Sequence, residues 1–114
     1  MHELGIVFHI IDQVKKVAYA NNVSHVNKVT LEVGEVSTLI PSYLIDCWNW
    51  AVKKEEIMSG CVLDVVVIEA KTYCTNCLKT YKTVEFGKIC PYCNSEETYL
   101  IEGNEKNIKE IEVV

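Results

Sequence analysis

The stretch CTNCLKTYKTVEFGKICPYC, residues 74–93, contains two CxxC motifs separated by twelve residues, and the rest of the chain is most simply explained as built around it. Cys74 and Cys77 form the first pair, and Cys90 and Cys93 form the second. Four thiolates in two pairs match the tetrahedral coordination of a structural Zn²⁺, and a spacer of this length can fold back so that the pairs meet. The double motif is much more specific than a single CxxC, and it predicts a four-cysteine zinc ribbon.

Three other uses of these cysteines stay open. Cys90-Pro91-Tyr92-Cys93 has the sequence of a glutaredoxin motif, but a redox CxxC needs a strand before it and a helix after it, and here a second CxxC precedes it and no helical pattern follows. The same four sulfurs match a rubredoxin-like iron site, which the spacing does not exclude. Paired disulfides are the least favoured use, because thiols stay reduced in the cytosol.

Length and composition limit the class of protein. A chain of 114 residues is one compact unit, or one domain with a small lobe that a metal must stabilise. The formal charge of −5, which four metal-bound thiolates would make more negative, argues against a nucleic-acid surface. No apolar run approaches the roughly 20 residues of a membrane-spanning helix, and the chain opens without a leader-like segment. We therefore expect a cytoplasmic protein that has neither a nucleic-acid nor a membrane partner.

The region before the cysteines contains two helical patterns and two extended ones. Apolar residues recur at spacings of three and four from residue 3 to residue 20, which predicts an amphipathic helix that ends at Asn21-Asn22. Its predicted buried stripe is Leu4, Val7, Phe8, Ile11, Val14 and Ala18. Alternating apolar residues predict a half-buried strand over residues 26–36. Pro41 suits the first turn of a second helix. Its predicted buried stripe is Ile40, Leu44, Cys47, Trp48 and Ala51.

The remaining segments predict strands. Residues 61–70 are rich in β-branched side chains and predict a central strand. Residues 80–86 predict a short strand between the CxxC motifs, and residues 99–101 and 108–114 predict two more after them. The last strand has Ile111 and Val113 on one face and charged residues on the other, so we expect it to return to the first sheet.

These elements predict an α+β fold. We expect a small α/β domain of two helices on a three-stranded sheet, formed by residues 1–70 and 99–114. The four-cysteine zinc ribbon is then an inserted domain, residues 71–98. Cys47 and Cys61 are interpreted as core thiols.

The amino terminus offers a second metal site. A free Met1 amine, the His2 backbone nitrogen and the His2 imidazole form successive chelate rings, and such nitrogen donors in a square-planar array suit Ni²⁺ or Cu²⁺. Glu3 adds a carboxylate that serves as a further ligand or as an outer acceptor. From the chemistry alone, a merely solvated histidine is the more ordinary interpretation. His9 is interpreted as an exposed histidine and His25 as a loop residue.

Several of these features together resemble the HypA/HybF family of hydrogenase maturation proteins. The resemblance rests on Met1-His2-Glu3-Leu4 at the start of an amphipathic helix, Val33-Gly34-Glu35 at the end of the first strand, the paired CxxC motifs and the terminal Ile111-Glu112-Val113. It covers essentially the whole chain, and the opening tripeptide and the paired motifs are its most specific parts.

The resemblance implies a nickel metallochaperone that hands Ni²⁺ to the large subunit of nickel–iron hydrogenase with a partner GTPase. By position, Met1, His2 and Glu3 are its nickel ligands, with nickel as transferable cargo. The zinc ligands are Cys74, Cys77, Cys90 and Cys93, with zinc as a structural ion. The chain departs from some members in lacking histidines beside the CxxC motifs, and Gly5 stands where serine is more usual.

No Ser/His/Asp set, phosphate-binding glycine loop or paired catalytic carboxylate is evident, so we do not expect an enzyme. Two other functions stay open at this level. One is a zinc-ribbon adaptor for proteins or nucleic acids without a second metal, and the other is a rubredoxin-like electron carrier.

Overall fold

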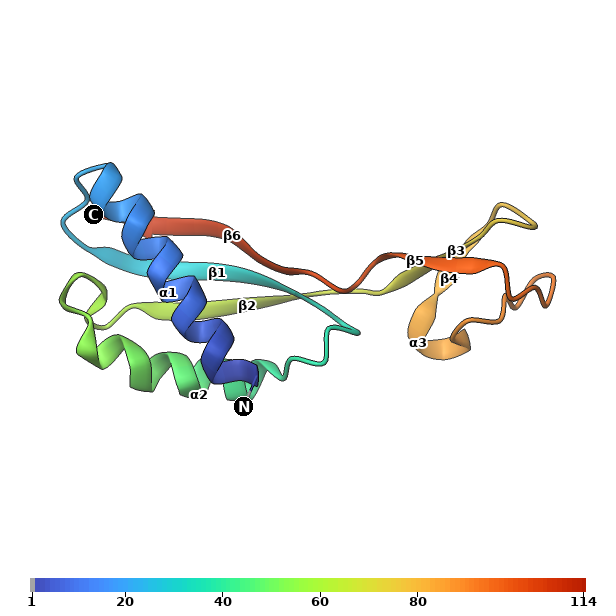
Figure 1. The fold of residues 1–114 in the computed structure, drawn as a ribbon, viewed down its shortest axis with the longest axis horizontal. Helices are drawn as coiled ribbons and strands as arrows, with labels where there is room; N and C mark the ends of the chain where they lie inside the picture. The colour runs from blue at the N-terminus through green and yellow to red at the C-terminus, as the bar shows by residue number, and fades with distance from the viewer. Residues whose placement is uncertain (1) are drawn as a thin grey trace. The chain divides into compact units, whose positions relative to one another are not determined.

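The computed structural model describes the backbone of residues 2–114 and the side chains of residues 3–114. The chain forms two compact units of helices and sheets, which confirms the α+β class (Figure 1). The first unit comprises residues 1–32, 39–66 and 107–114, and the second comprises residues 33–38 and 67–106. The division into domains at residues 71–98 that we expect from the sequence stays a prediction.

Two helices of the first unit lie where the apolar stripes predict them. Helix α1 spans His2–Ala20, and α2 spans Pro41–Ala51 with proline in its first turn. Helix α1 ends because Asn22 adopts a positive φ of 55°, a conformation that asparagine tolerates better than most residues. Short 3-10 turns follow α2 at Val52–Lys54 and Glu56–Met58. Within the part of the chain that the structure describes, no helix is both long and apolar enough to cross a membrane.

Two predicted stripe positions are wrong. Phe8 and Ile40 are 47% and 44% exposed, whereas Ile10, which the stripe omits, is buried. Phe8 lies at the margin of its stripe, where its ring packs edge-to-face on the exposed Trp50 at a centroid distance of 6.3 Å. Ile40 precedes α2 and has an extended backbone, so its side chain does not lie on the buried face that the spacing of a helix predicts. Leu4 and Cys47, also predicted to be buried, are half-buried.

The first sheet has three strands in the order β2-β1-β6. Strand β1 spans Val26–Gly34, β2 spans Val62–Ile68 and β6 spans Lys106–Val113. The chain therefore returns after the cysteine region to the first sheet, as predicted. The prediction of a central strand over residues 61–70 is wrong, because β2 lies at the edge of the sheet and β1 is central. Central β1 contributes the fully buried Val29 and Leu31, and α1 and α2 contribute buried apolar residues to the same unit. These are Val7, Ile10, Ile11, Val14, Ala18, Leu44, Trp48 and Ala51.

The second sheet holds the cysteine region and has the strand order β4-β3-β5. Strand β3 spans Lys71–Cys74, β4 spans Thr80–Lys82 and β5 spans Thr98–Glu102, and both pairings are antiparallel. The predicted strand over residues 80–86 is wrong beyond Lys82, because its partner β3 begins at Lys71, directly opposite Lys82. Residues Thr83–Phe86 form the helical turn α3 instead. Strand β3 is too short for its pattern to be recognised in the sequence.

Within the second unit, the last residue of β1 and the segment after it make short contacts with two other stretches of backbone. Gly34 donates its N–H to the Glu105 carbonyl at 2.8 Å, and Val36 donates to the Gly103 carbonyl at 2.8 Å. Glu35 closes the crossing with its carboxylate, which accepts the Ala70 N–H at 3.0 Å. We call these contacts the glycine crossing. They give Gly34 and Glu35 of the Val33-Gly34-Glu35 motif a structural role.

Candidate metal centre

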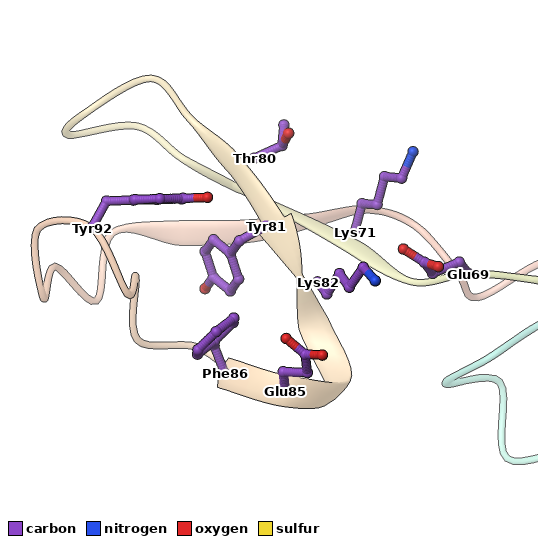
Figure 2. A pocket seen from close by; sticks show the side chains of 8 residues that line it. All are labelled: Glu69, Lys71, Thr80, Tyr81, Lys82, Glu85, Phe86 and Tyr92. Atoms are coloured by element: carbon purple, nitrogen blue, oxygen red, sulfur yellow. The ribbon is translucent and has the colours of Figure 1, made fainter.

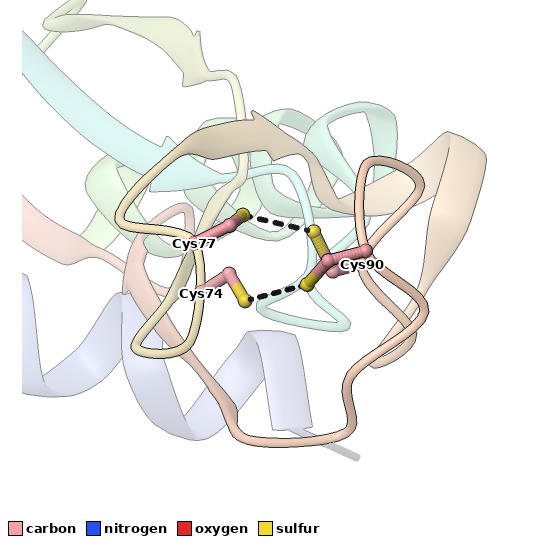
Figure 3. A group of neighbouring side chains, drawn as sticks. Cys74, Cys77 and Cys90 are labelled. Atoms are coloured by element: carbon pink, nitrogen blue, oxygen red, sulfur yellow. Dashed lines mark hydrogen bonds between the residues drawn. The ribbon is translucent and has the colours of Figure 1, made fainter.

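The four cysteines of the CxxC motifs converge on one point of the second unit. Their Sγ atoms all lie within 4.8 Å of one another, and the Cys74–Cys93 and Cys77–Cys90 distances are both 3.6 Å (Figure 3). The sulfurs are free thiols rather than disulfides. Tetrahedral Zn–S bonds of about 2.3 Å place the sulfurs about 3.8 Å apart, so the arrangement fits a four-sulfur metal site. A tetrahedral four-sulfur site also suits iron, so the geometry is compatible with either metal.

The two CxxC motifs fold into equivalent turns. In the first, the Cys74 N–H donates to the Lys79 carbonyl and the Leu78 N–H donates to the Cys74 carbonyl, both at 2.9 Å. In the second, Cys90 donates to Ser95 at 3.0 Å and Asn94 donates to Cys90 at 2.8 Å. Leu78 and Asn94 occupy the same place in their turns, with positive φ values of 62° and 61°. The sequence spacing thus encodes a repeated local structure that aims both sulfurs of each pair inward.

Longer contacts hold the two turns together. Thr75 donates its N–H and its hydroxyl to the Glu97 carbonyl, both at 2.9 Å. Tyr81 packs with Cys74 and Cys90 in a buried cluster, and its hydroxyl donates to the Gly87 carbonyl at 2.8 Å. The cysteines are themselves a large part of the core of this region, which is what a metal-dependent lobe requires.

Hydrogen bonds distinguish the half-buried sulfurs from each other. The Asn76 side-chain amide lies 3.4 Å from Cys93 Sγ and, with the Ser95 backbone, lowers the pKa of Cys93 to about 6. Partial burial and the adjacent Cys90 thiol raise the pKa of Cys77 to about 12. A bound metal ion deprotonates its coordinating thiols regardless of these differences.

Of the predicted nickel ligands, only Glu3 falls within the described side chains, because Met1 and the side chain of His2 lie outside them. Glu3 is 9% exposed, and its Oε2 atom accepts the Ile40 N–H at 3.3 Å. This contact joins the first turn of α1 to the start of α2, where a carboxylate also interacts favourably with the helix dipole. Glu3 therefore has a structural partner in addition to its predicted place beside nickel.

Two cavities lie along the contact between α1 and α2. One of about 370 Å³ is lined by Glu3, Tyr43, Asp46 and Cys47. The other, of about 280 Å³, is lined by Leu4, Asp46, Cys47 and Trp50. Both are mostly apolar, and the carboxylates and the thiol at their edges do not converge into a metal-binding group among the described residues.

The second unit has a further cavity of about 370 Å³ beside β4 (Figure 2). Lys71 and Lys82, which are direct cross-strand partners, line it together with Glu69, Glu85 and Tyr92. Its two positive and two negative side chains give no preference for a ligand of either charge.

The remaining candidate residues have ordinary structural places. Cys61 is buried, and burial raises its pKa to about 11, which makes it an unreactive thiol. His9 is exposed on α1, as predicted. His25 lies in the loop before β1, and its Nε2 atom donates to the Ser59 carbonyl at 2.8 Å.

Sequence reasoning did not identify Asn76, Leu78 or Asn94 as parts of the metal centre. For Asn94 a signal exists, because asparagine directly after a CxxC motif suits the positive φ of such a turn. For Leu78 the signal is absent, because leucine is unfavourable there. The contact between Asn76 and Cys93 joins residues seventeen apart and depends on how the two turns face each other.

Comparison with known proteins places this fold in a family. A family model described as "Hydrogenase/urease nickel incorporation, metallochaperone, hypA" matches residues 1–113. The hydrogenase maturation factor HybF of Klebsiella pneumoniae is 30% identical over 112 residues, which cover 98% of this chain and 98% of that protein. The hydrogenase maturation factor HypA of Trichodesmium erythraeum (strain IMS101) is 34% identical over 113 residues, which cover 99% of this chain and 96% of that protein.

A solved structure shows the same fold. The solution structure of the Ni metallochaperone HypA from Helicobacter pylori matches with a TM-score of 0.73 at 20% identity, covering 98% of this chain and 97% of that one. The family description is that of a metallochaperone, which carries metal rather than catalysing a reaction, in agreement with the expectation from the sequence. From the match over residues 1–113 and the full-length similarity to curated relatives, this chain belongs to the HypA family of metallochaperones for nickel incorporation into hydrogenase and urease.

Proposed function

We propose that this chain is a nickel metallochaperone that delivers Ni²⁺ during the maturation of nickel–iron hydrogenase and holds a second, structural Zn²⁺. The observation that carries the proposal is the match of the nickel-incorporation family over residues 1–113. The sequence supports it further, because Met1-His2-Glu3 provides the donors that a nickel site at this position requires.

Nickel would be bound by nitrogen donors at the amino terminus. The Met1 amine, the His2 backbone nitrogen and the His2 imidazole chelate one ion, and Ni²⁺ accepts such a tetragonal array readily. The Ile40 N–H binds Oε2 of Glu3, which leaves Oε1 to bind the metal or to accept a hydrogen bond from one of its ligands. A nickel site with few protein ligands can release its ion to an acceptor protein that provides more ligands.

Zinc would be bound by Cys74, Cys77, Cys90 and Cys93 and would not take part in delivery. Four sulfurs close the coordination sphere, which is typical of a structural rather than a catalytic zinc. Binding of this ion supplies much of the folding free energy of the surrounding turns. We propose that the resulting rigid lobe serves as a docking surface.

The partners follow from the family and not from the geometry. Relatives named hydrogenase maturation factors support a role in hydrogenase maturation. We propose the hydrogenase large subunit as the acceptor and a maturation GTPase as co-chaperone, which are the partners that the resemblance to the family implies. We place this exchange in the cytoplasm, where the six cysteines stay reduced.

The proposal is tested by equilibrium dialysis of Ni²⁺ against protein whose first residue is Met1, with nickel and zinc quantified before and after. We expect His2→Ala to lose the first equivalent of nickel while its zinc content and its circular dichroism stay the same. His9→Ala is the matched control, because His9 is an exposed histidine on the same helix, and it should bind nickel as the parent protein does.

Equal nickel uptake by the parent protein and His2→Ala contradicts the nickel site. A short extension ahead of Met1 gives a second test, because it removes the free amine and should weaken nickel binding. Metal analysis of the purified protein decides between zinc and iron in the cysteine site, since the zinc form is colourless and the oxidised iron form is red.

A further inference from the structure

The two CxxC turns are built alike, but only one of their outer sulfurs accepts a hydrogen bond from a side-chain amide. Asn76 Nδ2, in the first turn, lies 3.4 Å from Cys93 Sγ in the second. The equivalent position in the second turn is Tyr92, which has no amide to return to Cys77. Its ring instead packs under the Lys79 ammonium at 4.7 Å. Among the described side chains, Asn76 thus makes the one amide contact to a sulfur of the metal centre.

Burial identifies the sulfurs from which metal exchange would begin. Cys74 and Cys90 are 0% exposed, whereas Cys77 and Cys93 are half-buried. A chelator or competing ion must reach the metal on the side where a thiolate can leave, which is the side of Cys77 and Cys93. Asn76 therefore acts on one of the two thiolates whose departure opens the site.

We propose that Asn76 is a positioning residue that keeps the Cys93 thiolate on the bound metal and so slows the loss of zinc from the four-cysteine site. A four-thiolate zinc centre carries net negative charge, and an N–H donor to sulfur spreads part of that charge and fixes the direction of the sulfur lone pairs. The inference rests on the proposed zinc site. The role of Asn76 would explain why a chain that exchanges its nickel ion does not lose its structural zinc ion at the same time.

Asn76 lies in a surface turn, which makes it suitable for substitution. It is exposed, and its backbone φ is not in the positive range, so replacing it leaves the turn geometry intact. Asn76→Ala removes the amide. Asn76→Asp has nearly the same shape but offers an acceptor and a negative charge to the thiolate in place of a donor.

The test measures zinc transfer from the loaded protein to a chromophoric chelator. We expect Asn76→Ala to release zinc about 10-fold or more faster than the parent protein, the lower end of the effect usual for outer-shell partners of metal ligands. Asn76→Asp should release zinc at least as fast as Asn76→Ala. Thr75→Ala is the matched control in the same turn as Asn76. It removes a hydroxyl that does not reach a sulfur, while the Thr75 N–H still donates to the Glu97 carbonyl at 2.9 Å and keeps the two turns joined, so zinc release should stay within about 2-fold of the parent.

A spectroscopic measurement separates positioning of the sulfur from general loosening of the turn. In the Co²⁺-substituted protein, the sulfur-to-cobalt charge-transfer band should shift in Asn76→Ala and keep its place in Thr75→Ala. A release rate and a band that do not change in Asn76→Ala overturn the inference, and so does Thr75→Ala releasing zinc as fast as Asn76→Ala. A parent protein that takes up no zinc overturns the zinc site and this inference together, whereas failure of the nickel dialysis leaves the zinc measurements as decisive as before.

Discussion

At the residue scale, Leu78 has an unfavourable conformation that its neighbours impose. Its φ is 62°, its side chain is 69% exposed, and its N–H completes the first CxxC turn by donating to the Cys74 carbonyl. Leucine in this left-handed conformation costs about 1 kcal/mol relative to a residue that adopts it readily, and β-branched residues fit it less well still. The Leu78 side chain therefore gains little by packing, and the hydrogen bonds of the turn hold its backbone in the left-handed conformation.

We predict that Leu78→Val lowers the stability of the zinc-bound turn by about 1 kcal/mol, because valine resists the left-handed backbone that the turn requires. Leu78→Asn should cost nothing or stabilise it. The urea midpoint of zinc release measures both variants. Leu100→Val, the same change in extended strand β5, is the control and should have little effect. A Leu78→Val variant that matches this control is evidence that the turn does not need a positive φ at this position.

At the element scale, the glycine crossing holds the segment after β1 against two other stretches of the second unit. A Cβ atom on Gly34 would overlap the Gly103 carbonyl group, and a Cβ atom on Gly103 would overlap Ala70. Gly103 also has a φ of 113°, which other residues rarely adopt. Both glycines are required because backbone meets backbone there, with no flexible side chain that could move away.

We predict that Gly34→Ala destabilises the protein by about 1–3 kcal/mol or more, the usual cost of inserting a carbon atom where no space exists. Gly5→Ala is the matched control. Nothing lies within 4 Å of its added Cβ atom, and alanine in a helix should raise the free energy of unfolding by up to about 1 kcal/mol. The midpoint temperatures of thermal unfolding of the parent, Gly34→Ala and Gly5→Ala proteins test this prediction. Equal midpoints for Gly34→Ala and the parent would show that the glycine crossing has room for a Cβ atom at Gly34.

At the scale of the whole molecule, we expect the two units to depend on metal to different extents. The first unit has an apolar core that includes the fully buried Leu31, Leu44 and Trp48. In the second, a buried cluster consists of Tyr81 with the four cysteines of the CxxC motifs. We expect that a cluster of this size does not bury enough apolar surface to fold without a metal ion joining its sulfurs.

We predict that removing zinc with a chelator, or substituting Cys74→Ala, unfolds the region of residues 71–98 and leaves the first unit folded. Both tryptophans lie in α2, so their fluorescence reports on the first unit alone and should keep its emission maximum. The amide NMR signals of residues 71–98 should collapse to random-coil positions. A red shift of the Trp48 emission on loss of zinc would contradict the independence of the two units.

Much of the fold could be predicted from local patterns. Both helices, the long strands and the four converging cysteines follow from periodicity and spacing, because a helical stripe and a CxxC pair are defined by residues close in the chain. Ile111 and Val113 on one face of the last strand also predict the return of β6 to the first sheet, and the strand order confirms it.

Other features depend on which distant segments meet, and a single stretch of sequence does not contain that information. Strand β4 stops at Lys82 because its partner β3 begins at Lys71, and Phe8 is exposed because of its position relative to α2. The Asn76 amide reaches Cys93 only after both turns have formed around one centre. Short-range patterns in the sequence thus determine the helices, the long strands and the four cysteines. The ends of the strands, the burial of residues at the edge of a helix stripe and the hydrogen bonds to sulfur depend on packing between segments far apart in the chain, because those segments meet only in the folded structure.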